Sequence, residues 1–219
     1  LFPYTTLFRS RGREDKRKME EFEDLIVEKL MSTERDGMKD LIAAMKNDGF
    51  FAAPCSGSNH LAKEGGLAKH SWNVLIIMQD ISFLLTQRPE ILSDKAHNAI
   101  IICALLHDLG KMGDYGKPNY VPNMIKSRKK DENGEYPLVQ SEAKPYETNK
   151  DLLYIPHEVR SIAIAERFIK LTEEEEQAIL WHNGLYGSFK YDISGKETPL
   201  YLLLHFADMW SSRIVEEKS

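Results

Sequence analysis

Residues 104–111 read ALLHDLGK and close an uninterrupted apolar run that begins at Ala99. Such a run predicts a buried helix, yet it ends in two polar side chains placed side by side, His107 and Asp108. A buried charge is costly unless it is paired or coordinates a metal. The stretch therefore predicts a metal site at the end of a buried helix, and the remaining ligands must come from other parts of the chain.

The composition is that of an ordinary globular chain. The 219 residues are 42% hydrophobic and 29% charged, which is enough to build one domain with a sizeable core. The longest apolar run is too short to span a bilayer, so we expect no membrane partner. Two cysteines, Cys55 and Cys103, form no disulfide framework and favour a reducing, cytoplasmic location. The net charge of −5 argues against non-specific coating of nucleic acid, without excluding a local basic groove.

Hydrophobic periodicity predicts an all-α fold with one irregular insertion. Residues 1–13 begin with LFPYTTLFRS, which resembles a translated cloning adapter, and we leave them out of the fold prediction. Two helices are expected within residues 14–49, and the main domain over residues 50–215. The expected helices cover residues 14–31, 38 to about 48, 67–86, 94–108, 158–170, 173–183 and 199–215, with a capping box at Thr172–Glu175.

The insertion, residues 112–156, interrupts this helical pattern. Five prolines fall within residues 110–156, and Asn133-Gly134 predicts the turn of a small β-hairpin. One interpretation is a lid whose tyrosines pack on the helices, which would favour substrates of mononucleotide size. The other is a tract that stacks bases and follows a phosphate backbone, because tyrosines alternate with the basic run 126–130.

Further candidate ligands lie at helix ends or in apolar helices. His70 is expected near a helix start, His157 at another start, and His182 at a helix end, while Asp208 lies in an apolar helix. Imidazoles combined with carboxylates suit Mn, Fe, Co, Ni or Zn, whereas an all-oxygen cage would suit Ca or Mg. His97 and His205 are left unassigned.

The order His70, His107-Asp108, Asp208 resembles the HD-domain metal-dependent phosphohydrolase superfamily. The local signatures are Gly65-Gly66-Leu67-x-x-His70-Ser71 and Leu106-His107-Asp108-Leu109-Gly110-Lys111, and the resemblance covers about residues 50–213. It implies an HD-domain bundle of about five helices in which these four residues bind a catalytic divalent metal. His157 and His182 resemble the extra ligands of the binuclear branch, in which Asp108 would bridge two metals, although the His-His pair common in that branch is absent here.

The resemblance also implies roles for other residues. Asp108 and Lys111 would be catalytic, with Lys111 offsetting charge on the phosphoryl oxygens; the simpler interpretation of Lys111 is a solvated cation at a helix C-terminus. Ser56, Ser58 and His60 precede the first ligand helix and are candidates for the pocket wall. Arg128 is a candidate phosphate contact, unless its basic run is only a solvated loop.

The expected function is hydrolysis of a phosphate ester of a nucleotide, whether monophosphate, triphosphate, cyclic ester or diester, by metal-activated water. The first alternative is a 3′–5′ exonuclease on single-stranded nucleic acid, and the second is a non-catalytic regulatory module that binds a nucleotide. A third keeps the fold but uses a di-iron pair as an oxygenase. The partner would be a nucleotide or small phosphoester, and a homo-oligomer is compatible with the sequence. The sequence contains no Walker, GxGxxG or GxSxG motif, so kinase, dehydrogenase and serine-hydrolase functions have no support.

Overall fold

The computed structural model describes residues 20–85, 94–187 and 191–216, and this part of the chain is mostly helical with a small β insertion. Residues 14–19 of the first expected helix lie outside the described residues, which are helical at 20–32. Within the described ranges, no helix combines the length and apolar character needed to cross a membrane.

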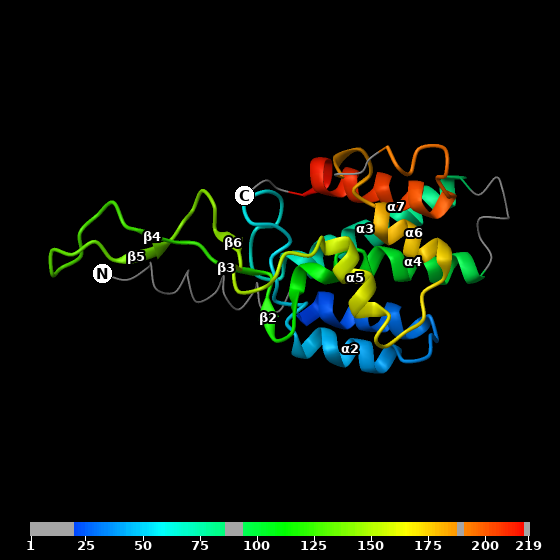
Figure 1. The fold of residues 1–219 in the computed structure, drawn as a ribbon, viewed down its shortest axis with the longest axis horizontal. Helices are drawn as coiled ribbons and strands as arrows, with labels where there is room; N and C mark the ends of the chain where they lie inside the picture. The colour runs from blue at the N-terminus through cyan, green and yellow to red at the C-terminus, as the bar shows by residue number, and fades with distance from the viewer. Residues whose placement is uncertain (1–19, 86–93, 188–190, 217–219) are drawn as a thin grey trace.

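The centre of the bundle is α4 (Asp94–Leu106), the apolar helix that precedes His107 and Asp108. Residues 100–106 are all buried, as expected for a helix that is apolar on every side. α3 (Gly66–Leu85) packs along α4, and α6 (Glu173–Trp181) and α7 (Pro199–Trp210) also contact it. α5 (His157–Ala165) packs on α6. α2 (Met38–Asn47) lies at the edge of the bundle opposite α7 (Figure 1).

Local sequence signals account for several helix ends. The capping box at α6 is present, with Thr172 accepting from the Glu175 amide and Glu175 accepting from the Thr172 amide. α7 begins with Pro199 after the cap Thr198. Two helices end well before the residue that the periodicity predicts: α5 ends at Ala165 instead of 170, and α7 ends at Trp210 instead of 215, before a π-helical turn over Ser211–Val215.

The insertion forms short antiparallel pairs rather than one hairpin. β1 (Gly113–Asp114) pairs with β2 (Lys117–Pro118), β3 (Tyr120–Pro122) with β6 (Tyr146–Thr148), and β4 (Met124–Lys126) with β5 (Leu138–Gln140). The expected turn lies at the end of the last pair, where Gly134 takes a positive φ of 80°. We call residues 119–149, which contain the last two pairs, the arm.

The arm extends away from the helices instead of covering them (Figure 1). The prediction that the tyrosines of the insertion, residues 112–156, pack on the bundle is wrong for three of them, since Tyr115, Tyr136 and Tyr154 are 75%, 51% and 87% exposed. A β-hairpin pattern specifies strand pairing but not the direction in which a ribbon leaves the domain. An arm that extends away from the helices does not support selection of mononucleotides by a closed lid.

A buried ion pair joins the N-terminal helices to α6. Arg35 follows the helix at 20–32 and donates to both carboxylate oxygens of Glu175, at 3.0 and 2.7 Å, and to the Lys170 carbonyl oxygen. Glu175 is fully buried, and its side chain also completes the capping box of α6 by accepting from the Thr172 amide. One carboxylate therefore anchors the start of α6 and the connection before α2.

We expect Arg35→Ala to lower the free energy of unfolding by about 2 kcal/mol, because it removes charged hydrogen bonds from a buried carboxylate. The matched control is Lys46→Ala, which breaks an exposed pair with Glu23 and should cost less than about 0.5 kcal/mol. Urea denaturation followed by circular dichroism measures both. Equal midpoints for the two variants would contradict the anchoring role of Arg35.

Candidate metal centre

The His107-Asp108 pair lies where α4 changes into a tighter turn. The amide of His107 still donates to the Cys103 carbonyl oxygen, and a 3-10 turn over Leu109–Met112 follows Asp108. Adjacent residues on a regular helix point about 100° apart, whereas here the change of backbone lets both side chains lean toward one point. Their facing atoms, His107 Nε2 and Asp108 Oδ2, lie 3.4 Å apart.

On one side of Asp108, side chains from α3 and α7 join this pair. His70 Nε2 lies 3.5 Å from Asp108 Oδ2, 3.3 Å from His107 Nε2 and 3.2 Å from Asp208 Oδ1. The structure thus brings together the four residues that the sequence grouped, His70, His107, Asp108 and Asp208, although they span 139 positions of the chain.

On the other side of Asp108, two further histidines face its second oxygen. His157 is the first residue of α5, and its Nε2 lies 3.2 Å from Asp108 Oδ1. His182 follows α6 directly, and its Nε2 lies 3.5 Å from the same oxygen and 3.4 Å from His157 Nε2. Asp108 therefore lies between two histidine groups, with one carboxylate oxygen directed at each.

The hydrogen bonds of the Nδ1 atoms of His107 and His182 determine that the Nε2 atoms carry the free lone pairs. His107 Nδ1 lies 2.9 Å from the Ala104 carbonyl oxygen, and His182 Nδ1 lies 2.7 Å from that of Ile179. A carbonyl oxygen can only accept, so each Nδ1 carries the proton, and in the neutral ring the Nε2 lone pair is free. These lone pairs point at carboxylate oxygens and at other Nε2 atoms. Acceptors that converge in this way are stabilised by a cation between them.

The charges of the cluster also indicate that a cation binds between these side chains. Burial raises the pKa of Asp108, but the Lys111 ammonium outweighs it and holds that pKa well below its usual range. Burial also raises the pKa values of Asp208 and Glu216, but the hydrogen bond that each makes with His70 outweighs burial. The pKa of Asp208 is therefore well below its usual value, and the pKa of Glu216 is lowered to about 2.

Burial lowers the pKa of His70, but Cys55 and the carboxylates of Asp208 and Glu216 outweigh it and raise that pKa well above its usual value. Three ionised carboxylates thus face two cations, His70 and Lys111.

Lys111 donates to Asp108 Oδ2 at 2.6 Å. Burial lowers the pKa of Lys111, but the Asp108 carboxylate outweighs burial and raises that pKa well above its usual value, so the ammonium stays protonated. These two cations, His70 and Lys111, leave one carboxylate charge unbalanced, and Asp108 Oδ1 is a buried oxygen that no described side chain satisfies with a hydrogen bond. The donor set, its surplus negative charge and this oxygen fit a bound metal ion, and these side chains could hold one.

Gly110 explains why the turn after Asp108 can approach α5. A Cβ at this position would overlap the carbonyl oxygen of His157. The Gly110 amide donates to Ser161 Oγ at 2.8 Å, and Ser161 Oγ donates to the His157 carbonyl oxygen at 2.8 Å. The glycine of the HDLGK stretch therefore places the start of α5, and with it His157, beside Asp108.

Glu216, which no sequence pattern identifies, positions His70. The π-helical turn after α7 returns the chain to α3, where His70 Nδ1 lies 2.9 Å from Glu216 Oε1. Asn73 and Ser211 also donate to this oxygen, at 3.0 and 2.6 Å. A carboxylate behind a histidine orients the ring and raises its basicity as a ligand. A glutamate near the end of the chain carries no sequence signal that would identify this contact.

Of the other candidate site residues, the structure brings His60 to the cluster but not Arg128. His60 lies beside His70, with its Nε2 3.3 Å from Cys55 Sγ, and burial lowers its pKa to about 4. Ser56 is buried, and it stabilises its own loop by donating to the His60 carbonyl oxygen. Arg128 is exposed on the arm, beyond β4, and the structure does not bring it to the cluster.

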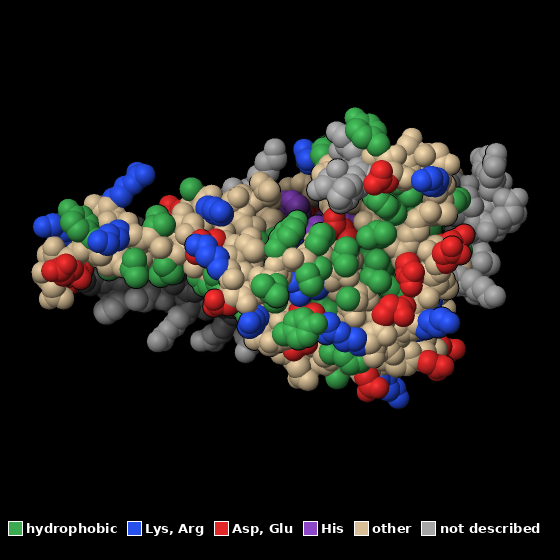
Figure 2. Space-filling model, in the orientation of Figure 1, with side chains coloured by type: hydrophobic (Ala, Val, Ile, Leu, Met, Phe, Trp, Pro, Cys, Tyr) green, Lys and Arg blue, Asp and Glu red, His purple; other side chains and the backbone are tan. Residues whose placement is uncertain are grey.

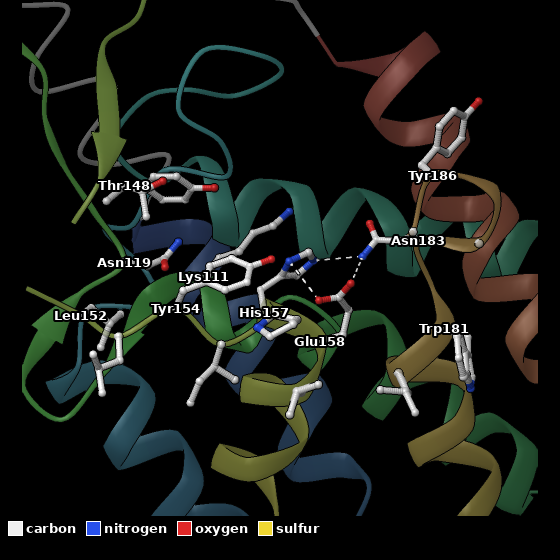
Figure 3. Close-up of a pocket in the computed structure, with 18 residues that line it drawn as sticks. Lys111, Asn119, Thr148, Leu152, Tyr154, His157, Glu158, Trp181, Asn183 and Tyr186 are labelled. Carbon is white, nitrogen blue, oxygen red and sulfur yellow. Dashed lines mark hydrogen bonds and ion pairs between the residues drawn. The ribbon is translucent and has the colours of Figure 1, made fainter. Parts of the chain in front are cut away.

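Two cavities open beside the cluster. The first, of about 440 Å³, has His157, Tyr154 and Trp181 in its wall (Figure 3). The second, of about 460 Å³, has His60, Asp208 and Arg213 in its wall.

Figure 2 shows histidine side chains at the surface between the arm and the bundle. Within the cluster His157 and Asp208 are partly exposed, whereas His70, His107 and His182 are buried, so solvent reaches the cluster at its two ends.

Asn183 and Glu158, also missed by the sequence analysis, support His157 at the edge of the first cavity (Figure 3). Asn183 Nδ2 donates to Glu158 Oε1 at 2.5 Å, and Glu158 Oε2 lies 3.3 Å from His157 Nδ1. His205, which the sequence left unassigned, contacts the backbone of His182: its Nδ1 lies 2.7 Å from the His182 carbonyl oxygen.

Comparison with known proteins gave no match: no family model, no curated protein and no solved structure is similar to this chain at a significant level.

We expect Asp108→Ala to remove bound metal while leaving the helix content nearly unchanged, because Asp108 is the one carboxylate that faces both histidine groups. The matched control is His97→Ala, since His97 is an exposed histidine on α4 outside the cluster. Mass-spectrometric metal analysis after loading with Mn²⁺ measures the bound ion, and circular dichroism measures the helix content. Wild-type stoichiometry in Asp108→Ala would contradict the site.

Proposed function

We propose that the protein is a metal-dependent phosphohydrolase of the HD-domain type, acting on a phosphate ester of a nucleotide. The observation that carries the proposal is the position of Asp108, with one oxygen toward His70 and His107 and the other toward His157 and His182. One shared carboxylate between two sets of imidazoles is an arrangement suited to two divalent transition metals, such as Mn, Fe, Co, Ni or Zn. The proposal also rests on the ordered motif His70, His107-Asp108, Asp208.

Bound divalent metals would lower the pKa of water toward neutrality and polarise a phosphoryl oxygen. The chain itself supplies the remaining functions. Lys111 borders both cavities and keeps its positive charge, so its ammonium can donate to a phosphoryl oxygen as negative charge develops there. The backbone contacts of His107 and His182 hold the two rings in the tautomer that directs a lone pair inward.

The complete set of inward-facing side chains distinguishes this proposal from a purely regulatory nucleotide-binding module. Binding alone needs neither a shared carboxylate nor a lysine beside it. A 3′–5′ exonuclease remains the second candidate function, because the arm exposes a basic run that includes Arg128, Lys129 and Lys130. Cations next to the exposed Tyr136 could follow a nucleic-acid backbone.

We expect the purified protein to hydrolyse nucleotide phosphate esters with Mn, Co, Ni or Mg, and Lys111→Ala to lower kcat by roughly 100-fold with metal content retained. The matched control is Lys150→Ala, an exposed lysine in neither cavity wall, which should retain wild-type kcat. Phosphate release and product chromatography measure the rates. A metal-loaded protein inactive on every ester would show that the proposed activity is wrong.

The arm decides between the two candidate functions. Replacing Arg128, Lys129 and Lys130 together by alanine should change kcat/KM for a small nucleotide by less than about threefold, because no residue of this run borders either cavity. If activity is instead highest on long single strands, and the triple variant loses it together with its salt dependence, the exonuclease is the correct function.

A further inference from the structure

The two cavities adjoin beside the cluster, and each borders a different part of it. Both include Lys111, Asn183 and Tyr186 in their walls. The first also includes His157, which faces Asp108 Oδ1, and the second includes Asp208, which contacts His70 on the Oδ2 side. A phosphate held at Lys111 would therefore have one cavity on each side.

Each cavity by itself is large enough for a small ligand. Their volumes, about 440 and 460 Å³, both fall within the range of roughly 300–1,000 Å³ that small-molecule sites occupy. A phosphate monoester carries one substituent and would use one cavity. A phosphodiester carries a substituent on each side of the phosphorus and would use both.

The first cavity offers apolar and aromatic surface that folding does not explain. Leu153, Tyr154 and Ile155 come directly before Pro156 and His157, and they are 83%, 87% and 42% exposed. Three successive exposed apolar side chains next to a polar cluster indicate a binding surface. The Tyr154 ring lies beside Lys111 and His157, and Trp181 lies at another part of the same wall (Figure 3). A planar base can stack on such rings.

The second cavity offers polar contacts and a cation. Ser58, Asn59 and Ser212 border it, and the Arg213 guanidinium lies over the Tyr186 ring at 4.7 Å from the ring centre. Stacking on the ring restricts the orientation of the guanidinium, whose donors suit a phosphate oxygen or a base edge. The two cavities therefore differ in chemistry as well as in position.

We propose that the substrate is a phosphodiester with a nucleoside on each side, a dinucleotide-sized ester, whose base on one side stacks at Tyr154 while the other nucleoside occupies the cavity bordered by Arg213. This inference rests on the proposed phosphohydrolase function. In the reaction a water oxygen bonds to phosphorus and one P–O bond breaks. The released nucleoside leaves as an alcohol with a proton from that water, and the other nucleoside keeps the phosphate as a monoester.

The test compares adenylyl-3′,5′-adenosine with adenosine 5′-monophosphate on the Mn²⁺-loaded protein. We expect kcat/KM for the dinucleotide to exceed that for the monoester by more than about tenfold, since only the dinucleotide fills both cavities. Equal or faster turnover of the monoester would overturn the inference while leaving the phosphohydrolase function intact.

Substitutions of Tyr154 and Arg213 test whether each cavity binds one nucleoside of the dinucleotide. Tyr154→Ala should raise KM for the dinucleotide about tenfold, the usual loss when one base loses its stacking partner, with little change in kcat. Tyr115→Ala is the matched control, because Tyr115 is also largely exposed but borders neither cavity. Arg213→Ala should raise KM as well, and Arg213→Lys should restore part of the loss. Wild-type KM in both Tyr154→Ala and Arg213→Ala would overturn the inference.

A binding measurement separates this inference from the proposed function. If the dinucleotide, the monoester and bis(p-nitrophenyl) phosphate all resist hydrolysis with Mn, Co, Ni and Mg, the phosphohydrolase function is wrong. Calorimetry with the phosphorothioate of the dinucleotide then decides the binding question by itself. Tighter binding than the monophosphate, weakened in both Tyr154→Ala and Arg213→Ala, supports the two-sided site, and equal affinity overturns it.

Discussion

The site depends on one buried carboxylate, Asp108, placed between imidazoles that cannot satisfy it. The Nδ1 atoms of His107 and His182 are committed to backbone carbonyl oxygens, so their Nε2 lone pairs face the aspartate instead of donating to it. Lys111 is the cation that contacts this carboxylate, and it reaches only Oδ2. A buried anion surrounded by acceptors is costly unless a cation completes it. A metal ion between Asp108 and these imidazoles would supply that cation.

The packing of the apolar helices brings the side chains of the cluster to a common point. α4 is buried along residues 100–106 and delivers His107 and Asp108 at its end. Gly110 then allows the next turn to contact the backbone of α5, which fixes His157. Each of these features is a packing requirement, and together they determine which nitrogen or oxygen atoms meet. The proposed chemistry therefore depends on the core as much as on the ligands.

Sequence reasoning reached the features that are local in the chain. An apolar run with two polar residues at its end, and a capping box at Thr172, are each readable over a few positions. Glu216 was not reachable, because it meets His70 across 146 positions through a π-helical turn that periodicity does not reveal. The arm was predicted as a β-hairpin, but its direction was not, since strand pairing leaves the angle to the bundle open. Arg213 was missed because its position depends on stacking with Tyr186.

The most direct test of the central claim is the position of metal ions around Asp108. Crystals of the Mn²⁺-loaded protein, measured at the manganese absorption edge, should show two anomalous peaks on either side of this carboxylate. One peak should be contacted by Oδ2 with His70, His107 and Asp208, and the other by Oδ1 with His157 and His182, with metal–nitrogen distances near 2.1 Å, by analogy with about 2.0–2.1 Å for zinc. No peak at the cluster, with the histidine nitrogens bonded only to water or protein, would contradict the account.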